Sequence, residues 1–352
     1  MYIVLAIISF GILIAVHEVG HFSAAKLLGV KVNEFAIGMG PKLLKKQGKE
    51  TLYTLRLLPF GGFCAMEGEN ESSDDARSFT AQKGWRRVII LAAGGIANLI
   101  ACFIIIAITT SGMTSFVNTT ISELAEGFPN EGVQGLMAGD TIVSINGERL
   151  YYVDDFSLFM QFAKSGQVDL VIKRDGEKIT LRQFPLERRE YMTNGQVQLR
   201  YGISFTVVEA TAWEKLKYSC YLTANFIRYI RVSIAQLING TAGISEVSGP
   251  VGIVDAVNTI GRSSPSFSAA LGNIAWFMAF IGVNLAVVNL LPIPAMDGGR
   301  ILFIFITWAI EKIIRRRLDP KYEGYIHTTA LVLLMGFMVV VLVNDVVKIV
   351  NG

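Results

Sequence analysis

The chain has 352 residues, of which 52% are hydrophobic, and a mean hydropathy of +0.46; these values exclude an ordinary soluble protein and indicate a membrane protein with a soluble part. The net charge of +3 is too small to indicate a nucleic-acid partner. The cysteines lie far apart, without a Cys-x-x-Cys pair, so neither a disulfide framework nor a zinc knuckle is expected.

The first membrane helix is expected over residues 2–28, because about 20 apolar residues span the hydrocarbon core of a bilayer. No basic residue precedes it and no small-residue cleavage site follows it, so a removable signal peptide is not expected. Its second half contains His17-Glu18-Val19-Gly20-His21. Helical spacing places His17 and His21 on one face and Glu18 about 100° around the axis. This pattern is typical of zinc hydrolases, with two imidazole ligands and a carboxylate as general base.

The composition of the chain favours a metal site at this motif. There are three histidines in all, and two of them stand in the motif. Ionisable groups inside a membrane helix cost about 2–3 kcal/mol each and need partners, which a metal ion supplies. The alternative is a first helix that ends near Val16, with the motif as a solvated turn beyond it.

A β-rich element is expected after the first helix. Two partly alternating stretches, 32–40 and 51–57, are separated by Pro41 and a basic segment, and residues 59–63 are expected to form a turn. We expect this hairpin to dip toward the membrane beside the first helix, where protein or water can cover its backbone. The alternative is an ordinary cytoplasmic hairpin. The acidic, serine-rich residues 67–80 are expected to be mobile.

A second membrane helix is expected over residues 88–110, where a small-residue segment suits close packing and Asn98 suits an interhelical hydrogen bond. Hydrophobicity falls over residues 113–206, and two hairpin signals, Asn146-Gly147 and Asp175-Gly176, stand between short β-type runs. One small soluble domain is expected there. Its predicted strands are residues 141–145, 168–173, 178–181 and 201–205.

The last third of the chain returns to helical patterns. An amphipathic helix over residues 209–238 is expected to lie on the outer membrane surface or against the bundle, and a turn is expected at residues 249–252. The third membrane segment covers residues 274–291 and ends before two prolines. The fourth covers residues 328–347.

Basic residues set the expected orientation. Eleven Lys and Arg residues lie between Lys26 and Arg87, and a second basic cluster lies between Lys312 and Lys321. The positive-inside rule places both stretches in the cytoplasm. Four crossings then leave both chain ends and the soluble domain outside the cytoplasm.

A third metal ligand is expected because two histidines alone hold zinc poorly. Asp297 follows the proline-broken third segment at about the membrane depth of His17 and His21, and we interpret it as that ligand. Glu67 and Glu69 are not favoured because the stretch beside them is expected to be flexible. The alternative is that Asp297 only caps the helix that begins at Gly298.

The His-Glu-x-x-His motif, together with Asn289-Leu-Leu-Pro-Ile-Pro-Ala-Met-Asp297-Gly, resembles the site-2 protease family of intramembrane zinc metalloproteases, in particular its bacterial RseP-type branch. The similarity extends to residues 35–41, 58–63 and 248–253, and residues 135–147 resemble a PDZ domain. The chain departs from the family at Gly95, where proline is usual, and at Met296, where leucine is usual. It also has one PDZ-like domain where some relatives have two.

The resemblance implies a zinc-dependent endopeptidase that cleaves transmembrane segments of single-span proteins, such as anti-sigma factors or signal-peptide remnants, after a first cut by a site-1-type protease. It implies that Glu18 is the general base and that Zn²⁺ is the cofactor. The implied zinc ligands are His17, His21 and Asp297. The implied substrate-binding residues are Asn289, Pro292 and Pro294. The PDZ-like domain would filter substrates by size or bind a new carboxyl terminus.

The expected fold is therefore a polytopic α-helical membrane protein with four transmembrane helices, a membrane-associated β-hairpin element and one inserted extracytoplasmic PDZ-like α+β domain. The expected location is the bacterial cytoplasmic (inner) membrane, with the lipid bilayer as a partner and no nucleic acid. Two other classes remain open: a non-catalytic PDZ-bearing membrane scaffold and a metal transporter. The expected domains are 1–112 and 274–352 for the two halves of the membrane core, 113–206 for the PDZ-like domain and 207–273 for the amphipathic extracytoplasmic segment.

Overall fold

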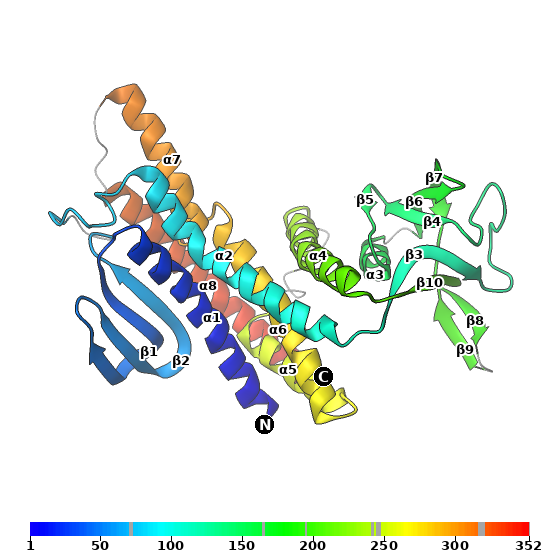
Figure 1. The fold of residues 1–352 in the computed structure, drawn as a ribbon, viewed down its shortest axis with the longest axis horizontal. Helices are drawn as coiled ribbons and strands as arrows, with labels where there is room; N and C mark the ends of the chain where they lie inside the picture. The colour runs from blue at the N-terminus through cyan, green and yellow to red at the C-terminus, as the bar shows by residue number, and fades with distance from the viewer. Residues whose placement is uncertain are drawn as a thin grey trace. The chain divides into compact units, whose positions relative to one another are not determined.

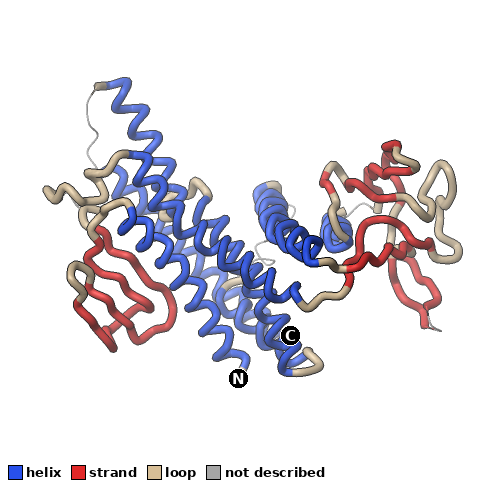
Figure 2. The backbone as a smooth tube through the Cα atoms, in the orientation of Figure 1, coloured by secondary structure: helices blue, strands red, loops and turns tan. Residues whose placement is uncertain are grey.

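The computed structural model describes residues 1–69, 73–163, 166–193, 196–240, 243, 248–315 and 321–351. The chain divides into two compact units, one made of Met1–Thr109 with Leu222–Gly352 and one made of Thr110–Tyr221 (Figure 1). The first unit is mainly helical and carries one β-hairpin, whereas the second is mainly strand (Figure 2). The second unit thus interrupts the first in the sequence.

Four helices of the described chain are long and apolar enough to cross a membrane, which confirms the four predicted segments. They are α1 (Tyr2–Leu27), α2 (Gly84–Ser111), α6 (Phe267–Leu290) and α8 (Lys321–Asn351). The helix α6 begins earlier than residue 274, because the Ser266 hydroxyl accepts a hydrogen bond from the Ala269 amide at 3.2 Å and caps its first turn. The predicted amphipathic helix is α4 (Ala212–Ile238), and α7 (Asp297–Ile314) follows α6.

The turn predicted at residues 249–252 was wrong, because the helix α5 (Pro250–Ser263) begins there. Proline is well suited to the first turn of a helix, because an N–H group at that position would have no partner within the helix. The buried Asp345 carboxylate of α8 accepts hydrogen bonds from the Gly249 amide at 3.1 Å and from the Gly252 amide at 2.9 Å. This contact comes from a residue far along the chain, so the local sequence did not reveal the helix.

The β-hairpin is longer and more folded than predicted. Its strands are β1 (Val32–Gln47) and β2 (Leu52–Met66), and residues 34–37 pair with both residues 52–55 and residues 62–65. Each long strand therefore bends, and the two halves of both strands form a sheet of four neighbouring backbone segments. The expected break at Pro41 and the expected turn at residues 59–63 both lie inside strands. Glycines with positive φ, Gly38 at 85° and Gly61 at 80°, supply the bends instead.

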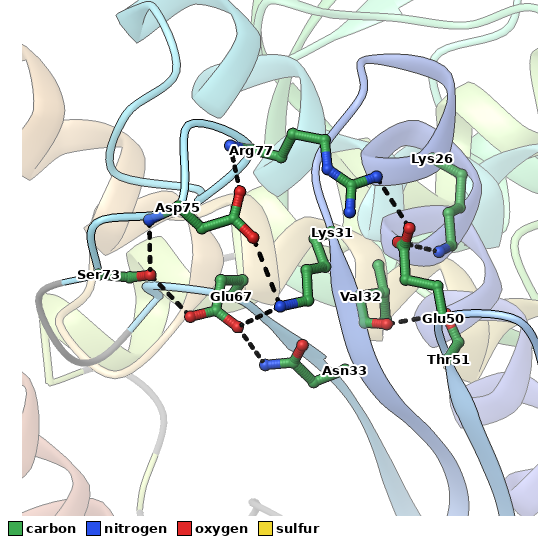
Figure 3. A network of polar contacts seen from close by, with 10 residues as sticks. All are labelled: Lys26, Lys31, Val32, Asn33, Glu50, Thr51, Glu67, Ser73, Asp75 and Arg77. Carbon is green, nitrogen blue, oxygen red and sulfur yellow. Dashed lines mark hydrogen bonds and ion pairs between the residues drawn. The ribbon is translucent and has the colours of Figure 1, made fainter.

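A polar network ties this hairpin to α1 and to the segment that follows β2 (Figure 3). The Glu50 carboxylate accepts hydrogen bonds from Lys26 of α1 at 2.7 Å and from Arg77 at 2.8 Å. The Lys31 amide also donates to the Arg77 carbonyl at 3.0 Å, and Phe79 is only 3% exposed. The expectation of a mobile segment was therefore wrong for residues 73–80, and residues 70–72 lie outside the described residues.

We expect Glu50→Gln to lower the thermal midpoint of unfolding at neutral pH but not in strong acid. Hydrogen bonds from Lys26 and Arg77 hold the pKa of Glu50 at about 2, below its ordinary value of 4.5. A depressed carboxyl pKa contributes stability above pH 4.5, and this contribution is lost as the pH falls toward 2. The difference in midpoint between the two proteins should therefore shrink over that window in a scan of pH. The exposed Asp74→Asn variant is the control, and a Glu50 effect that is independent of pH would contradict the assignment.

The second unit is built on an antiparallel sheet with the strand order β10-β3-β4-β6-β7, with β5 paired to β4. Its elements are β3 (Ser115–Leu124), β4 (Thr141–Ile145), β5 (Glu148–Arg149), α3 (Val153–Phe162), β6 (Gln167–Arg174), β7 (Glu177–Pro185), β8 (Arg189–Thr193), β9 (Gln196–Arg200) and β10 (Ile203–Glu209). All four predicted strands are present. The two predicted hairpin turns follow β4 and β6, where Asn146 and Asp175 each have a φ of 50°.

The boundaries of the second unit extend beyond the predicted residues 113–206. The strand β10 pairs with β3, and Phe116 of β3 stacks on Tyr218 of α4 with a centroid separation of 4.5 Å. Hydrogen bonds between Thr110 and Ser219 and from Lys215 to the Ser111 carbonyl join the two ends of this unit. The first turns of α4 consequently belong to the second unit.

Candidate metal centre

The helix α1 brings the two histidines of the motif to one buried face. His17 is 8% exposed and His21 is 7% exposed. The Nδ1 atom of His21 lies 2.8 Å from the Ile90 carbonyl of α2, which can only accept a hydrogen bond. Nδ1 therefore carries the proton and Nε2 carries a lone pair. The neighbouring helix thus orients His21 as a potential ligand through Nε2.

Asp297 reaches the same place from the far end of the chain. The helix α6 ends at Leu290, and Asp297 is the first residue of α7, after a tight connection. Its Oδ2 atom lies 3.2 Å from the Nε2 atom of His17 and 3.2 Å from that of His21. The N-cap of α7 is Met296, so Asp297 is not the cap that the alternative interpretation required.

The three groups fit a zinc ion. A zinc site with metal–nitrogen distances of about 2.0–2.1 Å and tetrahedral angles separates its donor atoms by about 3.3–3.4 Å. The two Nε2 atoms lie 3.1 Å apart, and each lies 3.2 Å from the carboxylate oxygen. Two imidazoles and one carboxylate are three protein ligands, which leaves a fourth position for water.

Gly94 of α2 leaves the space that the histidines occupy. A Cβ atom at this position would lie 2.7 Å from Cε1 of His17 and still closer to Nε2 of His21. The sequence indicated only that small residues here suit helix packing. The structure gives Gly94 a more specific role, because its missing side chain admits the imidazole rings.

Glu18 lies next to the cluster and faces the hairpin. A Cβ atom on Gly62 of β2 would lie 3.2 Å from Cγ of Glu18, so the strand passes close to this side chain. Within the described residues, no hydrogen bond or ion pair involves the half-buried Glu18 carboxylate. The carboxylate is therefore available to a water molecule or a substrate.

The predicted substrate-binding residues lie along the α6–α7 connection. The amide nitrogen of Asn289 lies 3.5 Å from Nε2 of His17, at the limit of a hydrogen bond, so this side chain borders the cluster. Pro292 is exposed and Pro294 is partly buried. The two prolines fix φ in the connection.

Two contacts that support Asp297 were not predicted. The Ala295 amide donates to Nδ1 of His327 in α8 at 2.9 Å, and Ala295 has a φ of 76°. Glu69 forms an ion pair with Arg300, which lies one turn beyond Asp297 on α7. The sequence signal for the first contact is a third histidine at the edge of the fourth apolar segment. Glu69 was not favoured as a ligand because its surroundings were expected to be flexible.

We expect His327→Ala to lower stability by about 1–2 kcal/mol, because the partly buried Ala295 amide loses its acceptor. Activity should fall about tenfold as the connection that carries Asp297 loosens, since small misplacements at a reacting centre are costly. The measurements are the thermal midpoint and the rate of cleavage of a membrane substrate. His327→Gln retains an acceptor and should recover part of both values, whereas equal effects of the two variants would argue against this contact.

Known proteins resemble this chain over nearly its whole length. The model of Peptidase family M50 matches residues 5–337. The chain belongs to Peptidase family M50. It is 37% identical to a Clostridium perfringens protein named "Putative zinc metalloprotease CPE1693", with 99% of each chain covered. It is also 27% identical to "Regulator of sigma-W protease RasP" of Bacillus subtilis, with 97% of each chain covered.

These similarities confirm the predicted family of site-2 proteases, the predicted metalloendopeptidase activity and the predicted zinc cofactor. Together with the four apolar helices, they make this M50 peptidase a multi-pass membrane protein. They favour an enzyme over the scaffold and the transporter.

Proposed function

We propose that His17, His21 and Asp297 bind the zinc ion of this M50 peptidase and that Glu18 is its general base. The observation that carries the proposal is the approach of the Asp297 Oδ2 atom to both Nε2 atoms at 3.2 Å. These groups come from α1 and from the start of α7, so their meeting is a property of the fold rather than of one local motif. A carboxylate among two imidazoles is a donor set that suits zinc.

The proposed chemistry is hydrolysis of a peptide bond. Zinc, when bound, lowers the pKa of a water molecule to about 7 and polarises the scissile carbonyl group. Glu18 accepts a proton from the attacking water and delivers it to the nitrogen of the leaving amine. Its position beside the two histidines on α1, without a competing partner among the described residues, suits this role.

The proposed substrates are transmembrane segments of single-span proteins. A helical segment has its backbone carbonyls hydrogen-bonded, so it must unwind locally before a water molecule can attack. The strand β2 passes beside Glu18 at Gly62, where an unwound strand could pair with the hairpin. Asn289 would bond a freed backbone group, while Pro292 and Pro294 would shape the wall of the substrate site.

The proposed role of the second unit is to select substrates. Residues 113–206 would form a PDZ-like domain that filters by size or binds a new carboxyl terminus, and residues 207–273 would lie at the extracytoplasmic surface. The enzyme would sit in the bacterial cytoplasmic membrane, with both chain ends outside the cytoplasm. It would act after a site-1-type protease, and the sigma-W name of the Bacillus subtilis relative makes anti-sigma factors a first class to examine.

The experiment compares cells that carry wild-type protein with cells that carry Glu18→Gln, by proteomics of membrane fragments. Single-span stubs that lack their external portion should accumulate only with the variant. Equal amounts of such stubs in both strains would contradict intramembrane proteolysis. The pattern of accumulated stubs would also reveal the substrate class and the site of the first cut.

A further inference from the structure

One amide is buried without a partner inside the helix bundle. Asn98 of α2 is 0% exposed, and within the described residues neither its Nδ2 nor its Oδ1 atom has a hydrogen-bond partner. The interhelical hydrogen bond that the sequence suggested is therefore not formed by any described group. Buried amides without partners are costly, so such a residue calls for a physical explanation.

A second unsatisfied atom belongs to the metal centre. Nδ1 of His17 is buried and also has no hydrogen-bond partner among the described residues. A histidine that binds a metal through Nε2 carries a proton on Nδ1, and it nearly always donates this proton to an oxygen. His21 meets this requirement through the Ile90 carbonyl, but His17 does not.

The helices α1 and α2 run antiparallel where they cross. Gly94 lies against both histidines, because its absent Cβ atom would meet Nε2 of His21 and, at 2.7 Å, Cε1 of His17. Further along α2, Cys102 meets Leu13 of α1, because both side chains abut Gly282 of α6, with Leu13 2.8 Å from the position of its absent Cβ atom. Moving up α2 from Gly94 to Cys102 therefore moves down α1 from the level of the two histidines to that of Leu13.

This register places Asn98, one turn beyond Gly94 on α2, between the levels of His17 and Leu13. Asn98 lies four residues from each of the two α2 positions, and His17 lies four residues from Leu13. A spacing of four residues keeps positions on one helix face. The two unsatisfied polar groups thus lie within about one helical turn of each other at the same helix crossing.

We propose that a bridging water molecule accepts a hydrogen bond from His17 Nδ1–H and donates one to the Asn98 carboxamide oxygen, and that this link orients the imidazole toward the zinc ion. The inference rests on the proposed function, in which His17 is a ligand. Asn98 is a positioning residue, since it acts through His17. A neutral amide suits this place because a further buried carboxylate beside Glu18 and Asp297 would add an unpaired charge.

The test uses the full-length protein in detergent and measures the zinc dissociation constant by competition with a chelator. Asn98→Leu removes the acceptor but keeps the branched shape of the side chain, and it should weaken zinc binding about 10–100-fold. The absorption spectrum of the cobalt-substituted variant should change, because the geometry of the ligands changes. The thermal midpoint of the zinc-free variant should not fall, because the substitution removes an unpaired amide from an apolar interior.

Two variants separate positioning from packing. Asn98→Ser retains a neutral acceptor and should bind zinc more tightly than Asn98→Leu. Cys102→Ala alters the same helix face one turn away and should leave zinc binding unchanged. Wild-type affinity in Asn98→Leu, or equal losses in Asn98→Leu and Cys102→Ala, would overturn the positioning role. Retention of tight zinc binding by His17→Ala would instead overturn the proposed ligand set, and the present inference with it.

Discussion

Replacing Glu18 with glutamine is expected to lower the rate of peptide-bond cleavage by about 10²–10⁴-fold, because the variant cannot accept a proton from the attacking water. The amide is nearly the same size as the carboxylate, so the close passage of β2 at Gly62 should be preserved. Zinc content should stay at the wild-type level, because Glu18 is not among the proposed ligands. The measurements are cleavage of a single-span substrate in proteoliposomes and metal analysis of the same preparation.

Asp297→Ala is the matched comparison. It removes one of the three groups that meet at 3.1–3.2 Å, so both zinc content and activity should fall. Comparing the two variants therefore distinguishes the loss of the general base from the loss of the zinc ion. Substantial activity in Glu18→Gln would remove Glu18 as the general base, and full zinc retention in Asp297→Ala would remove Asp297 from the ligand set.

Gly94→Ala is expected to abolish zinc binding although it adds a single methyl group to a membrane helix. The new Cβ atom would lie 2.7 Å from Cε1 of His17 and would overlap Nε2 of His21. His21 has little freedom to move away, because Ile90 on the same α2 helix holds its Nδ1 atom. Displacement by about 1 Å at a reacting centre can cost about 100-fold in rate, so activity should fall at least that far.

The control is Gly272→Ala in α6, where an added Cβ atom meets no atom within 4 Å. Alanine has a higher helix propensity than glycine, so both variants should fold and insert. Zinc titration and cleavage rates of the two purified variants provide the comparison. Normal zinc binding by Gly94→Ala would mean that α2 can move away from α1, contrary to the close approach described here.

The sequence predicted those local elements well that depend on their own residue pattern and not on distant contacts. The membrane helices and the strands of the second unit follow apolar runs of the proper length, and Asn146-Gly147 lies at the turn that it indicated. The hairpin was predicted only in outline. Pro41 looked like a break, but bends at positive-φ glycines let the chain continue as strand on both sides. Residues 34–37 of β1 pair with two separate stretches of β2, and such pairing leaves no pattern in the local sequence.

Contacts between distant residues explain the remaining errors. Residues 73–80 looked mobile because they are polar, yet ion pairs and a buried Phe79 hold them against the hairpin. The helix α5 looked like a turn because its cap, Asp345, lies in the last helix. A window of local sequence contains neither partner, so composition alone favoured the wrong structure in both places.

The sequence by itself determined the spacing of His17, Glu18 and His21, since one helical turn fixes their relative directions wherever the helix lies. It also pointed to Asp297, through the proline-broken segment and the family resemblance. Only the tertiary structure decided that Asp297 meets both imidazoles, that Gly94 gives them room and that Asn98 is buried without a partner among the described residues. The physical reason is that these relations depend on how α1, α2 and α7 pack together, and packing brings together residues that no local pattern links.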